Sequence, residues 1–412
     1  MTQQLLDQYD WAILGDHPSA FWTAQILANS GLSVLVLPLI SSGSAISSSS
    51  TLRFFERTSF PSFLAEDAPA ELVQILTPSR RVMLYPDREL LEQELFSVYG
   101  KANRPKDLIQ GLEFMVRGHD LGRFASESFD TLIKRVQGQR YFSYGKVQIA
   151  ELLKDQLRRS GVHVIEDRKL QQIFVDAKGV SGVQLEGQSK TVSIKSALMC
   201  TSWEHSQGLF ASEPVTLFPG RENKRALGWW FCIQFTMNSE MLPPGATSKM
   251  IYSEENGPIV EVERLSVHLR RGTQSWIART LLPYDPQSLN RVVQRKTSQR
   301  LFRLLQSILP FLEYAVSEIS PDIRDPEKVE EVELPAFYPF QKLAEIPPHL
   351  LAYGGQDLGF LTPHPQIYRA YRDAFPRFGD LGCYHACANA VMDWAKRNQK
   401  PVPEKIKEGL LS

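Results

Sequence analysis

A six-residue turn near the start of the chain has the residue types and spacing that can hold an anion. Its sequence is Gly15-Asp16-His17-Pro18-Ser19-Ala20. The free N–H groups and the dipole at a helix start favour a phosphate, and the dinucleotide fingerprint G-x-G-x-x-G/A uses this position. Gly15 and Ala20 match the first and third positions of that fingerprint. The candidate cofactor-binding residues of this turn are Gly15, His17, Ser19 and Ala20.

The second glycine of the fingerprint is replaced by His17. That glycine lets bare main chain touch the diphosphate, so an imidazole there crowds the contact, and Asp16 adds a repulsive charge. The following strand ends with Leu37-Pro38 and supplies no acid to hydrogen-bond a ribose. The turn therefore keeps the scaffold of a dinucleotide site and loses part of its chemistry.

The elements around the turn predict a βαβ unit. Residues 11–14 are an apolar run ending at Gly15, as in a buried parallel strand. Apolar residues recur at helical spacing from Ala20 to Ala28, and Gly31 is a typical helix stop. Residues 33–37 predict a second buried strand. Strand, helix and parallel strand in this order form a right-handed crossover.

The rest of the chain alternates between strands and helices after residues 52–140, where no order of elements emerges. A helix at 149–157 and a strand at 162–165 are predicted first. A small meander follows at 170–176, 182–185 and 191–194, and then a buried strand at 197–201. Residues 227–282 indicate an antiparallel sheet. A long helix at 289–312, interrupted near Pro310, a strand at 350–353 and a helix after Asp380 complete the prediction.

Composition excludes several classes of protein. The 412 residues carry 46 basic and 46 acidic side chains, and a neutral chain does not suit non-specific nucleic-acid binding. Four cysteines are too few for a disulfide scaffold and favour a reducing compartment. No apolar run reaches the ~18 residues of a membrane span, and the N-terminus lacks the pattern of a secretory signal. A cytoplasmic protein without an integral membrane segment is expected.

In its order of elements the chain resembles the two-domain FAD-dependent oxidoreductases of the amine-oxidase and phytoene-desaturase type. The matching pieces are residues 9–39, 145–201, 227–282 and 351–395. The resemblance implies an α/β fold, with a Rossmann-like FAD/NAD(P)-binding domain and a second, antiparallel β-rich substrate domain. It places the first domain at 1–60, 141–205 and 345–398. The substrate or cap domain is placed at 61–140 and 206–344, and a polar tail at 399–412.

The resemblance also implies FAD as the cofactor and adds contacts to the candidate site. Leu170 falls where the family's backbone contacts the adenine. Gly355 and Asp357 match a Gly-x-Asp whose carboxylate faces the ribityl chain. The family's Gly-Gly-Arg-like stretch matches only residues 42–45, Ser-Gly-Ser-Ala. FAD is thus the cofactor that the scaffold implies and that the local residues disfavour.

Three functions remain open. The first is an FAD-dependent oxidoreductase that accepts a hydride from an amine or apolar small-molecule substrate. The second is a cofactor-free protein of the same fold that binds a protein partner or acts in assembly, as in the Rab GDP-dissociation inhibitors, which resemble this fold. The third is an enzyme that uses another nucleotide. The sequence identifies no catalytic base, so no catalytic residue is assigned.

Other chemistry-bearing features have simpler alternatives. The serine-rich residues 41–51 could cradle a phosphate, but such a run is more often a mobile loop. Cys383 and Cys387 with His385 offer thiolates to a metal, yet no second ligand pair accompanies them. An aromatic group could line a substrate cavity, with core packing as the simpler alternative: Trp229, Trp230, Phe231 and Phe235. A basic group on the long helix could meet an anionic partner or a membrane surface, with a solvated helix face as the simpler alternative: Arg291, Arg295, Lys296, Arg300 and Arg303.

Overall fold

The computed structural model describes most of the chain. The described residues are 5–15, 17–38, 51–55, 72–85, 87–100, 105–117, 128–137, 139–166, 168–176, 179–188, 190–201, 206, 208–210, 226–255, 257–268, 272–320, 342–346, 350–354, 357–362, 364–378 and 380–410. Asp16, Gly355 and the serine-rich loop predicted at 41–51, apart from Thr51, lie outside them.

A seven-stranded sheet forms the first half of the molecule. Its strand order is β7-β2-β1-β10-β9-β8, with β17 also pairing with β10. β1, β2, β7, β10 and β17 pair in parallel, and the β8–β9–β10 meander is antiparallel. The predicted βαβ unit is confirmed, since β1 and β2 flank α1. The bounds are β1 Gln8–Leu14, β2 Val34–Leu37, β7 His163–Val164, β8 Leu170–Asp176, β9 Gly179–Leu185, β10 Val192–Met199 and β17 Ile367–Arg369.

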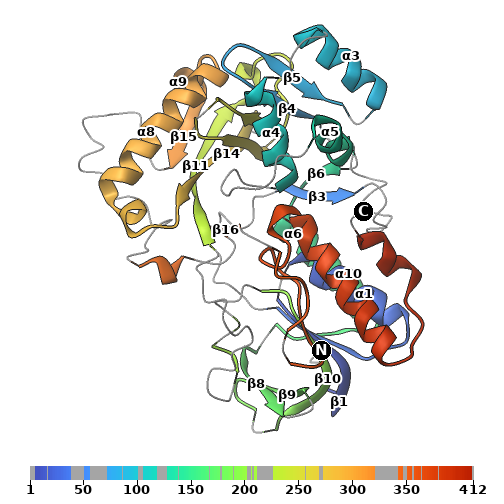
Figure 1. Ribbon diagram of the computed structural model, residues 1–412. Coiled ribbons are helices and arrows are strands. Elements are labelled where there is room, and N and C mark those ends of the chain that lie inside the picture. The colour runs from blue at the N-terminus through green and yellow to red at the C-terminus, as the bar shows by residue number, and fades with distance from the viewer. Residues whose placement is uncertain are drawn as a thin grey trace.

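Three helices cover one face of this sheet: α1 (Pro18–Asn29), α6 (Lys146–Arg159) and α10 (Asp380–Arg397). Trp11 and Ile13 of β1 are fully buried against this layer, where α1 and α10 run beside each other (Figure 1). Ala12 and Leu14 point to the other face, into a separate core with the meander strands. Both faces of β1 are therefore buried, which explains its continuous apolar sequence.

The second half of the molecule is an eight-stranded sheet. Its order is β15-β11-β14-β13-β12-β4-β5, with β16 also pairing with β11. All its pairs are antiparallel except β12–β4, so the antiparallel sheet predicted at 227–282 is confirmed. The bounds are β4 Val73–Leu76, β5 Arg81–Leu84, β11 Ala226–Asn238, β12 Lys249–Tyr252, β13 Val260–His268, β14 Thr273–Pro283, β15 Val316–Ser320 and β16 Leu351–Tyr353.

Helices lie on both faces of the second sheet. Trp229 of β11 donates its indole N–H to Ser288 Oγ at 2.7 Å, just before α8 (Arg291–Ile308). The next residue, Trp230, faces the other way and meets Phe114 of α4 (Lys106–Arg117) edge to face, with ring centroids 5.8 Å apart. Figure 1 shows α8 and α4 on opposite sides of the sheet. The alternation along β11 thus buries large aromatic side chains on both faces.

Short elements join the two sheets. Strands β3 (Thr51–Phe55) and β6 (Gln139–Gly145) pair antiparallel and lie between the two halves of the molecule in Figure 1. They belong, with α3 (Arg88–Tyr99), α4, α5 (Phe129–Gln137), β4 and β5, mainly to residues 52–140, for which no order of elements was predicted. The remaining elements are α9 (Leu312–Ala315), η2 (Ser239–Met241), η4 (Pro286–Leu289), η6 (Leu343–Glu345), η8 (Pro376–Phe378) and η9 (Glu404–Gly409).

The structure differs from the predicted elements in two strands and in the tail. The strands predicted at 191–194 and 197–201 are one strand, β10, which pairs with β9 through its first residues and with β1 along its length. Within the antiparallel sheet predicted at 227–282, the register of β13 on β14 shifts between Arg264 and Ser266. Within the polar stretch after residue 399, Ile406 is fully buried in the core beside α10.

Candidate functional site

The turn at Gly15 is shaped by close packing of two strand ends. Gly15 follows β1 and has φ +137°, a conformation that L side chains rarely adopt. A Cβ at this position would lie 2.3 Å from the carbonyl oxygen of Cys200, the first residue after β10. The glycine is therefore required by contact between neighbouring strand ends, whatever the turn binds.

His17 caps the helix that follows. It is the N-cap residue of α1, and its Nδ1 accepts a hydrogen bond from the backbone N–H of Ser19 at 3.2 Å. The same nitrogen lies 2.8 Å from the Ser19 hydroxyl oxygen. An N-cap side chain satisfies one of the backbone donors left free at a helix start. His17 thus takes the N-cap role that Ser, Thr, Asp or Asn usually fills.

The first three positions of α1, Pro18 to Ala20, leave no backbone donor for a ligand. Pro18 has no N–H, and the Ser19 N–H is bonded to the His17 ring. The Ala20 N–H donates to the His17 carbonyl oxygen at 2.8 Å. A diphosphate bound at a helix start relies on such N–H groups, and those of Ser19 and Ala20 are already bonded to His17.

Aromatic rings enclose the capping histidine. The His17 ring meets Tyr384 of α10 and Tyr371 edge to face, at centroid distances of 6.0 Å and 6.3 Å. His17 is 6% exposed, and Ser19 and Ala20 are completely buried. The predicted residues Gly15, His17, Ser19 and Ala20 do come together, but in the protein interior.

Beneath the turn, α1 and α10 meet through small polar side chains. The Ser19 carbonyl oxygen accepts from the Thr23 hydroxyl at 2.7 Å and from the Cys387 thiol at 3.7 Å. Gly382 allows α10 to pack closely against the segment that precedes it, because a Cβ at position 382 would lie 2.5 Å from the Phe375 carbonyl oxygen. The helix start is thus anchored from below by the C-terminal helix.

The later positions proposed for the cofactor lie apart from this turn in the strand order. Leu170 begins β8, which is separated from β1 by β10 and β9, and it is 8% exposed. Asp357 is partly buried in the segment between β16 and β17, and Gly355 lies outside the described residues. Their assignment as cofactor contacts stays a prediction.

The residues present do not fit a diphosphate on the start of α1. The His17 imidazole occupies the place where bare main chain would have to meet the phosphates, and the Ser19 and Ala20 N–H groups already donate to His17. Strand β2 ends with Leu37 followed by buried Pro38, so no carboxylate stands there to accept from a ribose hydroxyl.

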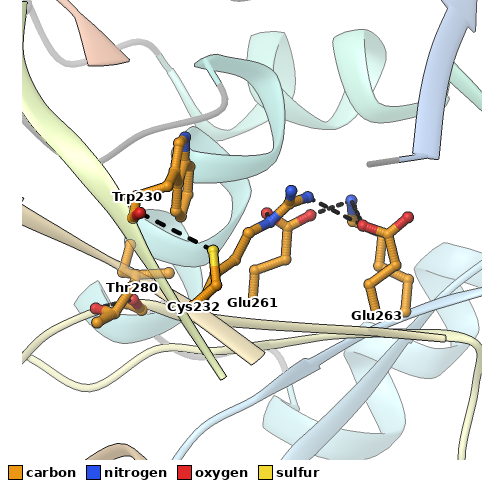
Figure 2. A network of polar contacts seen from close by, with 8 residues as sticks. Trp230, Cys232, Glu261, Glu263 and Thr280 are labelled. Atoms are coloured by element: carbon orange, nitrogen blue, oxygen red, sulfur yellow. Dashed lines mark hydrogen bonds and ion pairs between the residues drawn. The ribbon is translucent and has the colours of Figure 1, made fainter. Parts of the chain in front are cut away.

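The second sheet contains a buried network of charges that was not predicted from the sequence. Arg279 of β14 donates to Glu261 at 3.0 Å and to Glu263 at 2.9 Å, and Lys249 of β12 pairs with Glu261. Lys249, Glu261 and Glu263 are 1–2% exposed. Figure 2 shows the two carboxylates side by side. Among these four side chains, two basic groups meet two acidic groups.

The network lies on the face of the sheet that α4 covers. The Arg279 guanidinium stacks on the Trp230 ring, 5.2 Å from its centroid, and Trp230 contacts α4 through Phe114. Burial alone would lower the pKa of Arg279, but the Glu261 and Glu263 carboxylates raise it above its usual range. The only sequence signal was two glutamates at i and i+2 in an apolar strand, which places both on one face.

The remaining candidates have structural roles. Trp229, Phe231 and Phe235 are at most 1% exposed and form the core of the second sheet. Cys383 and Cys387 are buried thiols. Within the described ranges, no three His, Cys, Asp or Glu side chains are grouped so that they could hold a metal. In that same part of the chain, the helices are too short or too polar to cross a bilayer.

No model of a protein family matches the chain, and no curated protein matches it either. Solved structures do. An oxidoreductase from Methanosarcina mazei is 12% identical with a TM-score of 0.56, over 94% of this chain and 100% of that one. Cyclohexylamine oxidase from Brevibacterium oxydans is 14% identical with a TM-score of 0.54, over 95% and 100%. A geranylgeranyl bacteriochlorophyll reductase-like protein from Thermoplasma acidophilum is 12% identical with a TM-score of 0.50, over 98% and 82%.

These similarities confirm the predicted fold class. The chain is a mixed α/β protein with the fold of FAD-dependent oxidoreductases, in which a Rossmann-type unit is joined to a second, β-rich unit. At 12–14% identity the likeness extends to the fold alone.

Proposed function

We propose that this chain is a cofactor-free protein of flavoprotein fold that acts as a binding or assembly module. The flavoprotein scaffold stays, while the anion-binding start of α1 is closed by the chain's own side chains. Interactions with a partner would then replace redox chemistry as the function of the fold.

One observation carries this proposal: the hydrogen bond from the Ser19 N–H to His17 Nδ1, made in the interior between Tyr371 and Tyr384. To admit a diphosphate in the usual pose, the imidazole would have to leave its cap and both rings would have to yield. The lost cap alone would destabilise the helix by about 1 kcal/mol.

An FAD-dependent oxidoreductase acting on an amine or apolar substrate is the second candidate. It is favoured by the shared fold and by glycine and alanine at the first and third fingerprint positions, Gly15 and Ala20. The packing of Gly15 against Cys200 accounts for the first of these without a cofactor. We therefore rank this candidate below the cofactor-free protein.

The test is a cofactor screen on the purified full chain. We expect a colourless protein without flavin absorbance in the visible range. Its unfolding temperature should not change with FAD, NAD, NADP or ATP, although a ligand at about 100 times its Kd would add about 2.7 kcal/mol of stability. A yellow protein whose colour bleaches with an amine or apolar substrate would replace our proposal with the second candidate. A shift with ATP or a nicotinamide nucleotide would indicate an enzyme using that nucleotide.

Two variants sharpen the screen. His17→Gly restores the fingerprint glycine, and we expect it to bind no FAD, because the turn remains covered by Tyr371 and Tyr384. His17→Asn keeps a capping side chain and serves as the matched control for folding. Tight FAD binding by the glycine variant but not by the asparagine variant would mean that one side chain alone excludes the cofactor.

A further inference from the structure

The solvent face of α8 carries a line of positive charge. Val292, Lys296, Arg300 and Arg303 are exposed and follow one another at intervals of four, four and three residues, which places them on one face of the helix. We call this face the basic stripe. The opposite face, with Leu301, Phe302 and Leu305, is buried in the core of the second sheet.

Nothing in the helix itself balances this charge. The 18 residues of α8 contain no acidic side chain. Across the described ranges, no ion pair joins Lys296, Arg300 or Arg303 to a carboxylate. Because the whole chain has a formal net charge of zero, the stripe is a local concentration of charge.

Two aromatic side chains stand exposed at the end of the stripe. Phe311, the N-cap residue of α9, is 66% exposed, and Tyr314 within α9 is 83% exposed. Phe311 has a φ of +70°, the left-handed conformation that is unfavourable for a bulky residue. The backbone thus presents a phenyl ring to solvent at a conformational cost. Glu313 lies between the two aromatic residues and bonds to Gln306.

We propose that the basic stripe and the Phe311–Tyr314 pair dock the protein on an anionic lipid surface. Lysine and arginine side chains would face lipid headgroups, and the two rings would enter the interfacial layer that aromatic side chains favour. The helix keeps its packing on the sheet, so the contact is peripheral. Figure 1 places α8 and α9 at the outer edge of the molecule.

A lipid surface fits this arrangement better than an acidic protein does. The stripe lies on the outer face of a helix, with charges along the helix and apolar rings at one end. An acidic protein would satisfy the charges but would gain little from two protruding rings without a pocket to receive them. A bilayer receives cations and rings together, without a shaped partner surface.

The experiment measures co-sedimentation of the full chain with vesicles. One set contains phosphatidylcholine alone, and the other contains phosphatidylcholine with phosphatidylserine, at about 0.15 M salt. We expect binding only to the anionic vesicles. Neutralising three charges should weaken it on the order of a hundredfold, at about fivefold for each charge. The variant is Lys296→Gln, Arg300→Gln, Arg303→Gln.

A second variant tests the rings. Phe311→Asn with Tyr314→Ser removes both aromatic side chains, and asparagine tolerates the left-handed conformation at position 311. We expect weaker binding to the anionic vesicles at the same salt concentration. The matched control removes three exposed lysines near the C-terminus and should bind like the unaltered chain. It is Lys400→Gln, Lys405→Gln, Lys407→Gln.

Four outcomes would overturn the proposal. They are no binding to either vesicle, equal binding to both, equal losses in the stripe variant and the C-terminal control, and unchanged binding after loss of the two rings. In the last case, competition by a polyglutamate peptide would indicate an acidic protein as the partner. Circular dichroism melts of each variant separate a loss of docking from a loss of folding.

Discussion

Gly15 lies so close to Cys200 that a side chain at position 15 would strike the carbonyl oxygen of residue 200, with a Cβ–oxygen distance of 2.3 Å. Strands β1 and β10 are neighbours in the parallel sheet, so neither strand end can move without disturbing their pairing. We therefore expect Gly15→Ala to destabilise the fold by about 3 kcal/mol, by combining a clash with an unfavourable φ. Urea unfolding of the purified variant measures this loss.

The control for this prediction is Gly31→Ala. Gly31 also has a positive φ, +79°, but a Cβ there would meet no atom within 4 Å. Its replacement should therefore cost only the backbone strain, about 1–2 kcal/mol. Equal losses for both variants would show that the contact with Cys200 adds nothing.

Removing the histidine cap should weaken α1. His17→Ala loses the side chain that accepts from the Ser19 N–H, which we expect to destabilise the fold by about 1 kcal/mol, with a further loss because the ring is buried. His17→Asn should be the milder change, since asparagine is a strong N-cap residue. Thermal unfolding of the two variants compares them. If alanine proved as stable as histidine, the cap would contribute nothing.

Breaking the buried charge network should be far more damaging than breaking a surface pair. Lys249→Met removes a buried cation that pairs with the buried Glu261 carboxylate, which we expect to cost about 3–5 kcal/mol. Lys106→Met is the control, because the Lys106–Glu255 pair is exposed and should contribute at most about 1 kcal/mol. Similar losses from both would contradict a tightly coupled network.

A double variant tests how the buried charges depend on each other. Lys249→Met with Glu261→Leu removes one charge of each sign and restores neutrality. We expect it to be more stable than the sum of the single changes predicts, because the two partners of one buried ion pair are removed together. A double-mutant cycle by urea unfolding gives the coupling energy, and strictly additive losses would argue against the pairing.

His163 should make stability depend on pH. Its Nδ1 lies 2.5 Å from the Tyr9 hydroxyl, which itself accepts from the Leu6 N–H. Burial lowers the pKa of His163 below its ordinary value of 6.5. The folded state therefore binds fewer protons than the unfolded state just below pH 6.5, and stability should fall as the pH drops through this window.

The measurement is urea unfolding over a pH series, with an NMR titration of His163. His163→Gln should flatten the dependence. His364 is the comparison, because burial also lowers its pKa. His364→Gln should therefore remove only the part of the pH dependence of stability that His364 contributes. A titration of His163 above pH 6.5 would reverse the expected sign.

The parts of the fold that the sequence predicted are those with a local signal. The unit from β1 to β2 was predictable because its apolar runs are bounded by Gly15 and Gly31. The break near Pro310 also has a local cause, and the structure ends α8 at Ile308. In contrast, the pairing of β16 with β11 depends on contacts across more than a hundred residues, which no local pattern contains.

The candidate site, too, was predictable from the sequence only where the signal is local. The identity of His17 indicated that a diphosphate would be crowded. It did not indicate that the imidazole would cap α1, or that Tyr371 and Tyr384 would enclose it. The charge network stayed hidden for a similar reason. Its members come from β12, β13 and β14, and only the sheet register aligns Lys249 with Glu263 and Glu261 with Arg279.

The central strand of the first sheet has consequences for synthesis on the ribosome. β10 pairs with β1 near the N-terminus and with β17, which ends at residue 369. The sheet can therefore be completed only after residue 369 has emerged, and α10 closes over it later still. Until then β10 has an open edge prone to faulty association. Early translation termination should accordingly yield aggregates rather than a folded half, and chaperones that shield nascent strands should raise the yield of native protein.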